Sequence, residues 1–295
     1  MVVLETHNLT KVYSKKVKAV DSLNLTIEKG NIYGILGPNG SGKTTTLGMI
    51  LGIIAPTSGD YGWFGGQKGA AVRRKIGAIL ETPNFYPYLN AQKNLELVAH
   101  IKKVPKNTIP KLIELVGLAG RTDAPFSTYS LGMKQRLAIA GALIGDPEVL
   151  IFDEPTNGLD PQGIAEVRTL LSDIGAEGKT ILLASHIIDE VEKICNHVAI
   201  IKYGDLIASG SVAEILSTEP IIEVGTTDLA ALKKTLAGLN AVTSLREEMS
   251  FLELTLSPDF SATQLNQWLF EQGQVLNHLK VRKKSLEAEF LERTS

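Results

Sequence analysis

Short apolar runs separated by polar turns predict a chain that begins with strands. The segment 22–27 alternates apolar and polar residues, as a half-buried strand does, and a turn is predicted at 28–31. The apolar run 32–36 then meets a glycine-rich loop, 37–42, and a helical pattern begins at Lys43. This stretch therefore predicts a strand, a loop and a helix in succession.

The middle of the chain changes from a helical pattern to alternating strands and helices. Residues from about 90 to 145 predict mainly helix. After Pro147, short apolar or β-branched runs alternate with helical stretches, and the predicted strands are 149–152, 180–184 and 198–202. Such alternation is typical of a parallel sheet covered by helices. Asp160 is expected to cap one of these helices, with Pro161 at its first position.

From about Thr218 the pattern changes once more. Strands are predicted at 221–224, 242–245, 251–256 and 275–281, and helices at 229–239 and 261–272. We therefore expect an α/β domain over residues 1–218, with a helical subdomain at about 88–145. A small C-terminal accessory α+β domain is expected over 219–295.

Composition and charge exclude several classes of protein. With 30 basic and 32 acidic residues among 295, the net charge of −2 provides no positive field for a polyanion, and nucleic acid is not expected as a partner. The longest uncharged stretch, 44–59, is interrupted by glycine and proline and is shorter than the ~20 apolar residues that span a bilayer. The first residues show no pattern of a signal peptide. The single cysteine, Cys195, excludes an internal disulfide and is expected in the core.

The glycine-rich loop carries the first candidate chemistry. It fits the P-loop pattern G-x-x-x-x-G-K-[ST] in the sequence Gly37-Pro38-Asn39-Gly40-Ser41-Gly42-Lys43-Thr44. Glycines let backbone N–H groups converge on phosphate oxygens, and the following helix adds a partial positive charge there. Lys43 supplies a full charge for the β- and γ-phosphates, and the hydroxyl of Thr44 can bind Mg²⁺. The dinucleotide pattern G-x-G-x-x-G does not fit, because the glycines are spaced differently.

A second candidate element is a pair of carboxylates after the apolar run 149–152. Asp153 would hold Mg²⁺, and Glu154 is placed to accept a proton from an attacking water. Two further positions carry weaker signals when taken singly. Ser130 could be an ordinary helix cap, and His186, after the strand from Thr180, could be an ordinary loop histidine.

In this order and spacing, the segments together resemble the ATP-binding cassette (ABC) ATPases over about residues 1–218. The resemblance places Walker A at 37–44, the signature at 129–133, Walker B at 149–153 and the D-loop at 158–160. It implies that Glu154, His186 and Lys43 are catalytic and that Thr44, Asp153 and Glu81 are Mg²⁺ ligands. The ATP-binding residues that it implies are Tyr13, which would stack on adenine, then 37–42 with Lys43, Thr44 and Thr45, and finally Ser130, Gly132 and Asp160.

The chain departs from the family pattern at two places. The signature usually reads Leu-Ser-Gly-Gly-Gln, but Leu131 replaces its first glycine and Met133 its glutamine. Ser130 and Gly132, the residues most useful for contacting a γ-phosphate, are retained. At the Q-loop position the usual glutamine is Glu81, whose ionised carboxylate can bind a cation or a water but cannot donate a hydrogen bond.

These departures, with the segments 76–87 and 284–291, resemble the exporter ATPases of the bacitracin-resistance and lantibiotic-immunity branch. The resemblance implies an ATP- and Mg²⁺-dependent subunit at the cytoplasmic face of the membrane. Its partners would be a second ATPase chain, most simply an identical copy, and a separate transmembrane permease contacted near 81–95. Two alternatives remain open: a soluble ABC protein that acts as an assembly factor, for example on ribosomes, and a regulatory cassette that hydrolyses ATP poorly.

Overall fold

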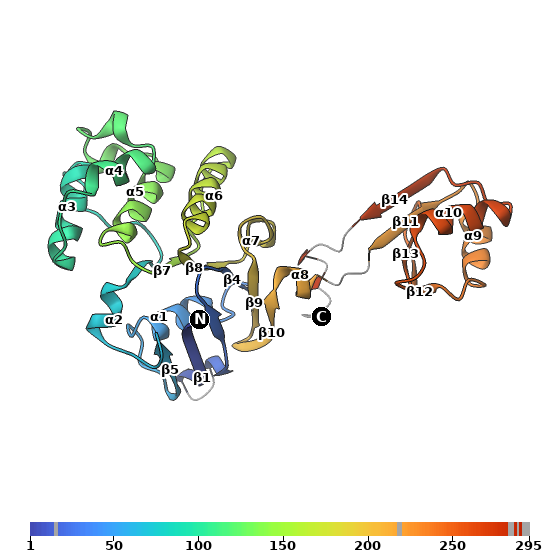
Figure 1. Cartoon of the computed structure of the whole chain (residues 1–295), viewed down its shortest axis with the longest axis horizontal. Coiled ribbons are helices and arrows are strands. Elements are labelled where there is room, and N and C mark those ends of the chain that lie inside the picture. Colours follow the sequence, from blue (N-terminus) through green and yellow to red (C-terminus); the bar gives the residue numbers. More distant parts are fainter. Residues whose placement is uncertain (15–16, 217–219, 283–285, 288, 291–295) are drawn as a thin grey trace. The chain divides into compact units, whose positions relative to one another are not determined.

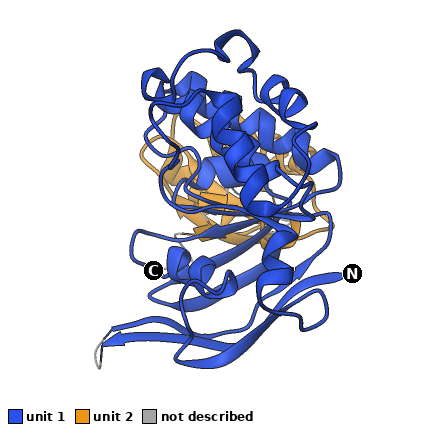
Figure 2. Cartoon of the chain, turned by 90° about the vertical axis from the view of Figure 1, so that its left-hand side faces the viewer, with its two compact units in different colours: residues 1–212, 294 blue, residues 213–293, 295 orange. Residues whose placement is uncertain are grey.

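The chain divides into two compact units, Met1–Val212 and a second unit from Ala213 onward (Figures 1 and 2). The computed structural model describes residues 1–14, 17–216, 220–282, 286–287 and 289–290. The expected boundary between residues 218 and 219, and parts of the segment 284–291, lie outside the described residues. The division into an ATPase domain and an accessory domain therefore stays a prediction.

The N-terminal strands form an antiparallel sheet. Its strands are β1 (Val2–Ser14), β2 (Val17–Leu23), β3 (Thr26–Glu28) and β5 (Ser58–Trp63). The strand order is β2-β1-β3, and β5 also pairs with β1. The single strand predicted over 22–27 is wrong, because two strands share this segment. Ser22 adopts a positive φ of 47°, and the side-chain amide of Asn24 donates to Asn8 and to the Ser22 carbonyl, so the pairing is interrupted between β2 and β3.

A six-stranded sheet in the order β10-β9-β4-β8-β7-β6 carries the motifs of the first unit. All neighbouring strands except β9 and β10 are parallel, which confirms the predicted architecture. The strands are β4 (Ile32–Leu36), β6 (Ile76–Ile79), β7 (Val149–Asp153), β8 (Thr180–Ser185), β9 (His197–Lys202) and β10 (Asp205–Ser211). Every residue of β7 and β8 is buried, as expected of strands covered on both faces.

Helices lie on this sheet and in the segment between β6 and β7. They are α1 (Lys43–Ile50), α2 (Ala70–Arg74), α3 (Ala91–Lys102), α4 (Ile109–Leu115), η1 (Ala119–Arg121), η2 (Phe126–Thr128), α5 (Leu131–Leu143), α6 (Pro161–Ala176) and α7 (Ile188–Ile194). A further short helix, α8 (Val212–Ile215), begins at the last residue of the first unit. In the described part of the chain, no helix combines the length and the apolar character needed to cross a bilayer. Cys195, after α7, is buried as predicted.

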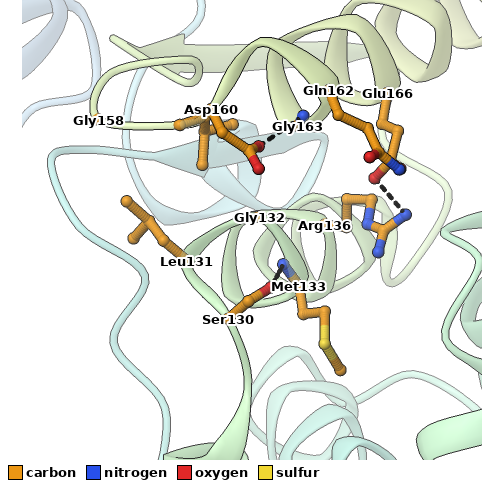
Figure 3. A pocket seen from close by; sticks show the side chains of 11 residues that line it. Ser130, Leu131, Gly132, Met133, Arg136, Gly158, Asp160, Gln162, Gly163 and Glu166 are labelled. Atoms are coloured by element: carbon orange, nitrogen blue, oxygen red, sulfur yellow. Dashed lines mark hydrogen bonds and ion pairs between the residues drawn. The ribbon is translucent and has the colours of Figure 1, made fainter.

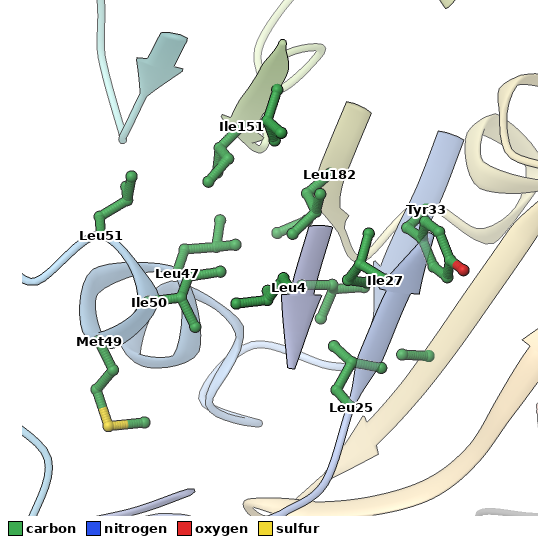
Figure 4. Packing of buried hydrophobic residues seen from close by; sticks show 14 of the residues in the cluster. Leu4, Leu25, Ile27, Tyr33, Leu47, Met49, Ile50, Leu51, Ile151 and Leu182 are labelled. Carbon is green, nitrogen blue, oxygen red and sulfur yellow. The ribbon is translucent and has the colours of Figure 1, made fainter. Parts of the chain in front are cut away.

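The core of the first unit fixes the position of α1. Leu47 and Ile50 of α1 pack in one buried cluster with Leu4 of the antiparallel sheet and with Ile151 and Leu182 of the central sheet (Figure 4). Each of these side chains is at most 2% exposed, and full burial of such a side chain contributes about 1.5–3 kcal/mol. The helix that begins at Lys43 is therefore held between both sheets, which sets the direction of its N-terminus.

The second unit is a β-α-β-β-α-β arrangement with an antiparallel sheet in the order β12-β13-β11-β14. Its elements are β11 (Ile221–Gly225), α9 (Leu229–Leu236), β12 (Val242–Glu247), β13 (Leu252–Leu256), α10 (Ala262–Glu271) and β14 (His278–Arg282). Each corresponds to a predicted strand or helix, although β14 begins three residues later than predicted. The chain forms a turn at the end of α10 before the strand begins. In this turn Gly273 has a φ of 77°, and the Gln274 amide donates to the Leu269 carbonyl.

Candidate active site

The glycine-rich loop joins the end of β4 to the start of α1, as the sequence predicts. Gly40 and Gly42 adopt φ angles of 80° and 108°, a region that side chains with a Cβ rarely adopt. A Cβ on Gly42 would also lie 2.2 Å from the carbonyl oxygen of Ala19. Glycine at these positions therefore permits the tight loop whose backbone N–H groups can face a phosphate.

Lys43 lies against this loop with only 6% of its surface exposed. Its ammonium donates to the carbonyl oxygens of Gly37 at 2.8 Å and Pro38 at 3.3 Å. The same nitrogen is 3.4 Å from Oε1 of Glu154. The positive charge is thus positioned between the loop and the carboxylate that follows β7.

The exposed Thr44, at the start of α1, and the buried Asp153, at the end of β7, form a hydrogen-bonded oxygen pair. The Thr44 hydroxyl donates to Oδ2 of Asp153 at 2.7 Å, and Asp153 is 2% exposed. Burial raises the pKa of Asp153, and the negative charges of Glu154 and Glu81 raise it further, whereas the Thr44 hydrogen bond and Lys43 oppose the shift. Its other oxygen, Oδ1, is buried and has no hydrogen-bond partner among the described residues. A hydroxyl beside an unpaired carboxylate oxygen fits Mg²⁺, which prefers oxygen ligands.

Glu154 and His186 are brought together from two strand ends. Nδ1 of His186 lies 2.8 Å from Oε2 of Glu154, and the His186 amide is 3.4 Å from the same oxygen. Glu154 has a positive φ of 49°, and its amide donates to the Ala184 carbonyl of β8 at 2.9 Å. This unusual backbone turns the Glu154 side chain away from the direction taken by Asp153 and toward the histidine.

Glu81 lies after β6 with a positive φ of 60° and an exposed side chain. Its charge is close enough to act on the pKa of Asp153. Among the described residues, however, no three histidine, cysteine or acidic side chains form a cluster that could hold a metal ion. Glu81 as a Mg²⁺ ligand therefore stays a prediction.

Tyr13 is exposed at the end of β1 and is not packed in the core. Its side chain is 56% exposed, and its hydroxyl is 3.5 Å from that of Thr45. The ammonium of Lys11 lies 5.3 Å from the centre of the ring. The ring is thus close to the P-loop helix and accessible to a base that could stack on it.

The remaining predicted residues line a different cavity, which we call the signature pocket (Figure 3). The Ser130 hydroxyl caps α5 by accepting from the Met133 amide at 3.3 Å, and Asp160 caps α6 by accepting from the Gly163 amide at 2.8 Å. The pocket has a volume of about 400 Å³. Its lining also includes Gly132.

The predicted residues thus fall into two groups. Contacts join one group, which we call the P-loop cluster: Lys43, Thr44, Asp153, Glu154 and His186. In the structure described here, no hydrogen bond or ion pair connects this cluster to the polar residues of the signature pocket.

Two charged residues that line the signature pocket were not among the site residues predicted from the sequence. Arg136 of α5 and Glu166 of α6 form an ion pair of 2.8 Å. Nothing in a separation of thirty residues indicates that these two side chains meet, because their contact depends on how two helices pack.

Comparisons with known proteins agree on one family. The family model described as ABC transporter matches residues 20–157. The bacitracin transport ATP-binding protein BcrA of Bacillus licheniformis is 47% identical over 210 residues, covering 70% of this chain and 68% of that protein. The lantibiotic transport ATP-binding protein SrtF of Streptococcus pyogenes is 41% identical over 204 residues, covering 69% of this chain and 89% of that protein.

A solved structure is also similar to this chain. It is a dimeric structure of a post-hydrolysis state of the ATP-binding cassette MJ0796 bound to ADP and Pi. The TM-score is 0.64 with 26% sequence identity, and the match covers 71% of this chain and 98% of that chain.

Proposed function

We propose, from the premise that this chain belongs to the ABC transporter family and is an ATP hydrolase, that it powers an exporter as one of two ATPase subunits. The observation that carries the proposal is the pair of contacts at Glu154. One carboxylate oxygen lies 3.4 Å from the Lys43 ammonium and the other lies 2.8 Å from His186. A base is thereby held beside the loop that binds phosphate.

The P-loop cluster fits magnesium-bound ATP. Backbone N–H groups of the loop and the N-terminus of α1 would bind the β- and γ-phosphates, and Lys43 would supply the positive charge. The Thr44 hydroxyl and the Asp153 carboxylate would hold Mg²⁺, which neutralises charge on the phosphates when it is bound. Tyr13 would offer its exposed ring to the adenine.

Glu154 acts in this proposal as the general base. Its carboxylate accepts a proton from the water that attacks the γ-phosphorus, while the bond from that phosphorus to the bridging oxygen breaks and ADP leaves. His186 and Lys43 contact different oxygens of the carboxylate, so they fix the direction in which it points. An oriented base needs no reorganisation when the water arrives, which is a large part of its effect on rate.

A complete site needs a second chain. Ser130 and Gly132 line the signature pocket, and among the described residues no hydrogen bond or ion pair joins the polar side chains of this pocket to the P-loop cluster of the same chain. In a head-to-tail pair, these residues of one copy would face the γ-phosphate bound to the other. Because each motif occurs once in the sequence, the partner is a second ATPase chain, most simply an identical copy. The similar cassette MJ0796 has a dimeric structure with ADP and Pi.

The transported substrate would pass through a separate transmembrane permease, with this chain bound at its cytoplasmic face. Peptide antibiotics are the substrate class that we propose, since the similar proteins BcrA and SrtF are described as bacitracin and lantibiotic transport proteins. The same descriptions favour transport over a soluble assembly factor. Purification from membranes of the native cell should bring a membrane protein with this chain, and soluble partners alone would contradict the proposal.

Glu154→Gln tests the ATPase mechanism. The amide retains the size of the side chain but cannot take the proton, so turnover should fall by at least about 100-fold. ATP binding should persist, and the variant should form a stable dimer at saturating ATP and Mg²⁺, measured by light scattering. The exposed Glu177, at the end of α6, provides the matched control Glu177→Gln, which should behave like the original protein. A Glu154→Gln protein that remained monomeric would refute the two-chain site.

A further inference from the structure

Three helices of the first unit each begin at one of the functional motifs. Ser130 caps α5, Asp160 caps α6, and α7 begins at Ile188, directly after the segment that holds His186. Helix α6 contacts both α5 and α7. The orientation of α6 relative to its two neighbours therefore decides how the signature, the D-loop and the histidine lie relative to one another.

An ion pair joins α5 to α6 in the wall of the signature pocket. Nη1 of Arg136 lies 2.8 Å from Oε2 of Glu166, and the Arg136 side chain is 19% exposed (Figure 3). The Nε atom of Arg136 is buried without a hydrogen-bond partner among the described residues, so Glu166 provides the main compensation for this charge. The other oxygen of Glu166 accepts from Gln162 at 2.9 Å, which orients the carboxylate along α6.

Because α5 and α6 also pack closely at their first turns, the ion pair between Arg136 and Glu166 constrains the angle between the two helices. A Cβ on Gly132 of α5 would lie 3.9 Å from the Cα of Gly163 of α6, so the first turns of the helices are near van der Waals contact. The contact between Arg136 and Glu166 lies one helical turn further along. Two contacts separated along both helices fix the angle between them, whereas one contact would leave it free to change.

A second ion pair joins α6 to α7. Nη1 of Arg168 is 3.5 Å from Oε1 of Glu190, whose side chain is only 7% exposed. The other oxygen of Glu190 is buried and has no hydrogen-bond partner in the described residues. Residues two apart on a helix lie about 200° apart around its axis, so Glu166 and Arg168 face opposite neighbours of α6. Glu190 lies in the first turn of α7, four residues after His186.

We propose that Glu166 and Glu190 are positioning residues of the ATPase. The pair of Arg136 with Glu166 holds the signature serine in register with the D-loop, so that both meet the second chain together. The pair of Arg168 with Glu190 holds the start of α7, and thereby His186, against Glu154. This inference rests on the proposed two-chain mechanism and assigns each pair to a different step: closure of the dimer for the first, and turnover within it for the second.

The first pair is tested by adding Glu166→Gln to the Glu154→Gln protein and measuring ATP-driven dimerisation of the full chain. The dimer dissociation constant should rise about tenfold, within the range of ordinary coupling between sites. The affinity of the monomer for a fluorescent ATP analogue should remain unchanged, because Glu166 does not touch the P-loop cluster. Exchanging the charges, with Arg136→Glu and Glu166→Arg together, should restore dimerisation to within about threefold of the parent.

The second pair is tested in the chain with Glu154 intact. Glu190→Gln should lower kcat about tenfold with little change in KM, and Arg168→Gln should do the same. The double variant should cost no more than either single change, because the two residues act through one contact. Arg168 is 31% exposed, so Arg168→Gln should fold and should still test this ion pair if Glu190→Gln were unstable.

Asp189 and Lys193 provide the matched control, since they form an exposed ion pair on the same helix α7. Asp189→Asn should change neither dimerisation nor kcat. Variants of Glu166 and Glu190 that matched this control would refute the inference, as would losses that appear equally in ATP affinity and melting temperature. A Glu154→Gln parent that stayed monomeric would refute the proposed function and this inference together. A parent that dimerised, with variants equal to it, would refute this inference alone.

Discussion

Replacing Asp153 with asparagine should stabilise the protein without nucleotide and destabilise it, relative to the original, when Mg²⁺ and ATP are present. The carboxylate is 2% exposed, and its Oδ1 has no hydrogen-bond partner among the described residues. Burial of the charge is the main cause of the raised pKa of Asp153, which means that the ionised form is disfavoured in the folded protein. An amide of the same shape removes that cost.

The magnitude follows from the contacts that change. Removing a buried charge that is only partly satisfied gains about 1–3 kcal/mol, and weakening the bond from Thr44 at 2.7 Å loses about 1 kcal/mol. The net gain is about 1 kcal/mol, or a rise in melting temperature of about 2–4 °C for a unit of this size. With nucleotide at 100 times its dissociation constant, the original protein gains about 2.7 kcal/mol. The variant should forgo this gain, because Asp153 is a proposed Mg²⁺ ligand.

Scanning calorimetry with and without ATP and Mg²⁺ measures this crossover directly. The pH dependence has a definite sign: because the folded pKa is raised, the destabilisation by Asp153 is present above that pKa and disappears as the pH falls below the ordinary value of an aspartate. The advantage of the variant should therefore shrink on acidification. Asp146→Asn, at an exposed aspartate paired with Lys179, is the control and should show no crossover. An Asp153→Asn protein less stable than the original without nucleotide would refute the reasoning.

Three further substitutions test separate parts of the site. Tyr13→Ala should weaken ATP binding about fivefold or more, since stacking of a base on an aromatic ring contributes about 1–3 kcal/mol, while Tyr13→Phe should bind normally in a fluorescence titration. Ser130→Asp should retain the melting temperature, because aspartate caps helices as well as serine, but lose ATP turnover through repulsion of the partner's γ-phosphate; unchanged turnover would exclude Ser130 from the site. Glu81→Gln should lower the pKa of Asp153 and raise the Mg²⁺ concentration for half-maximal turnover, whereas Glu148→Gln should change neither.

The elements and their chemistry could largely be predicted because they depend on neighbours along the chain. The P-loop, the strand before Asp153 and the caps at Ser130 and Asp160 are local features, in which turn geometry or a hydrogen bond joins residues only a few positions apart. The break in the predicted strand at 22–27 shows the limit of this approach. It depends on a side chain that reaches Asn8, sixteen residues away from Asn24.

By itself, the sequence thus determined which residues could bind phosphate, hold a cation or accept a proton, and it determined the alternation of strands and helices. Only the tertiary structure decided which of them meet. The sheet places β7 beside β8, so that Glu154 reaches His186, while α6 lies between α5 and α7 and pairs Glu166 with Arg136. The physical reason is that strand order and helix packing depend on the joint burial of apolar faces that are far apart in the chain. The spacing of charged residues along the sequence does not indicate which of them this packing brings together.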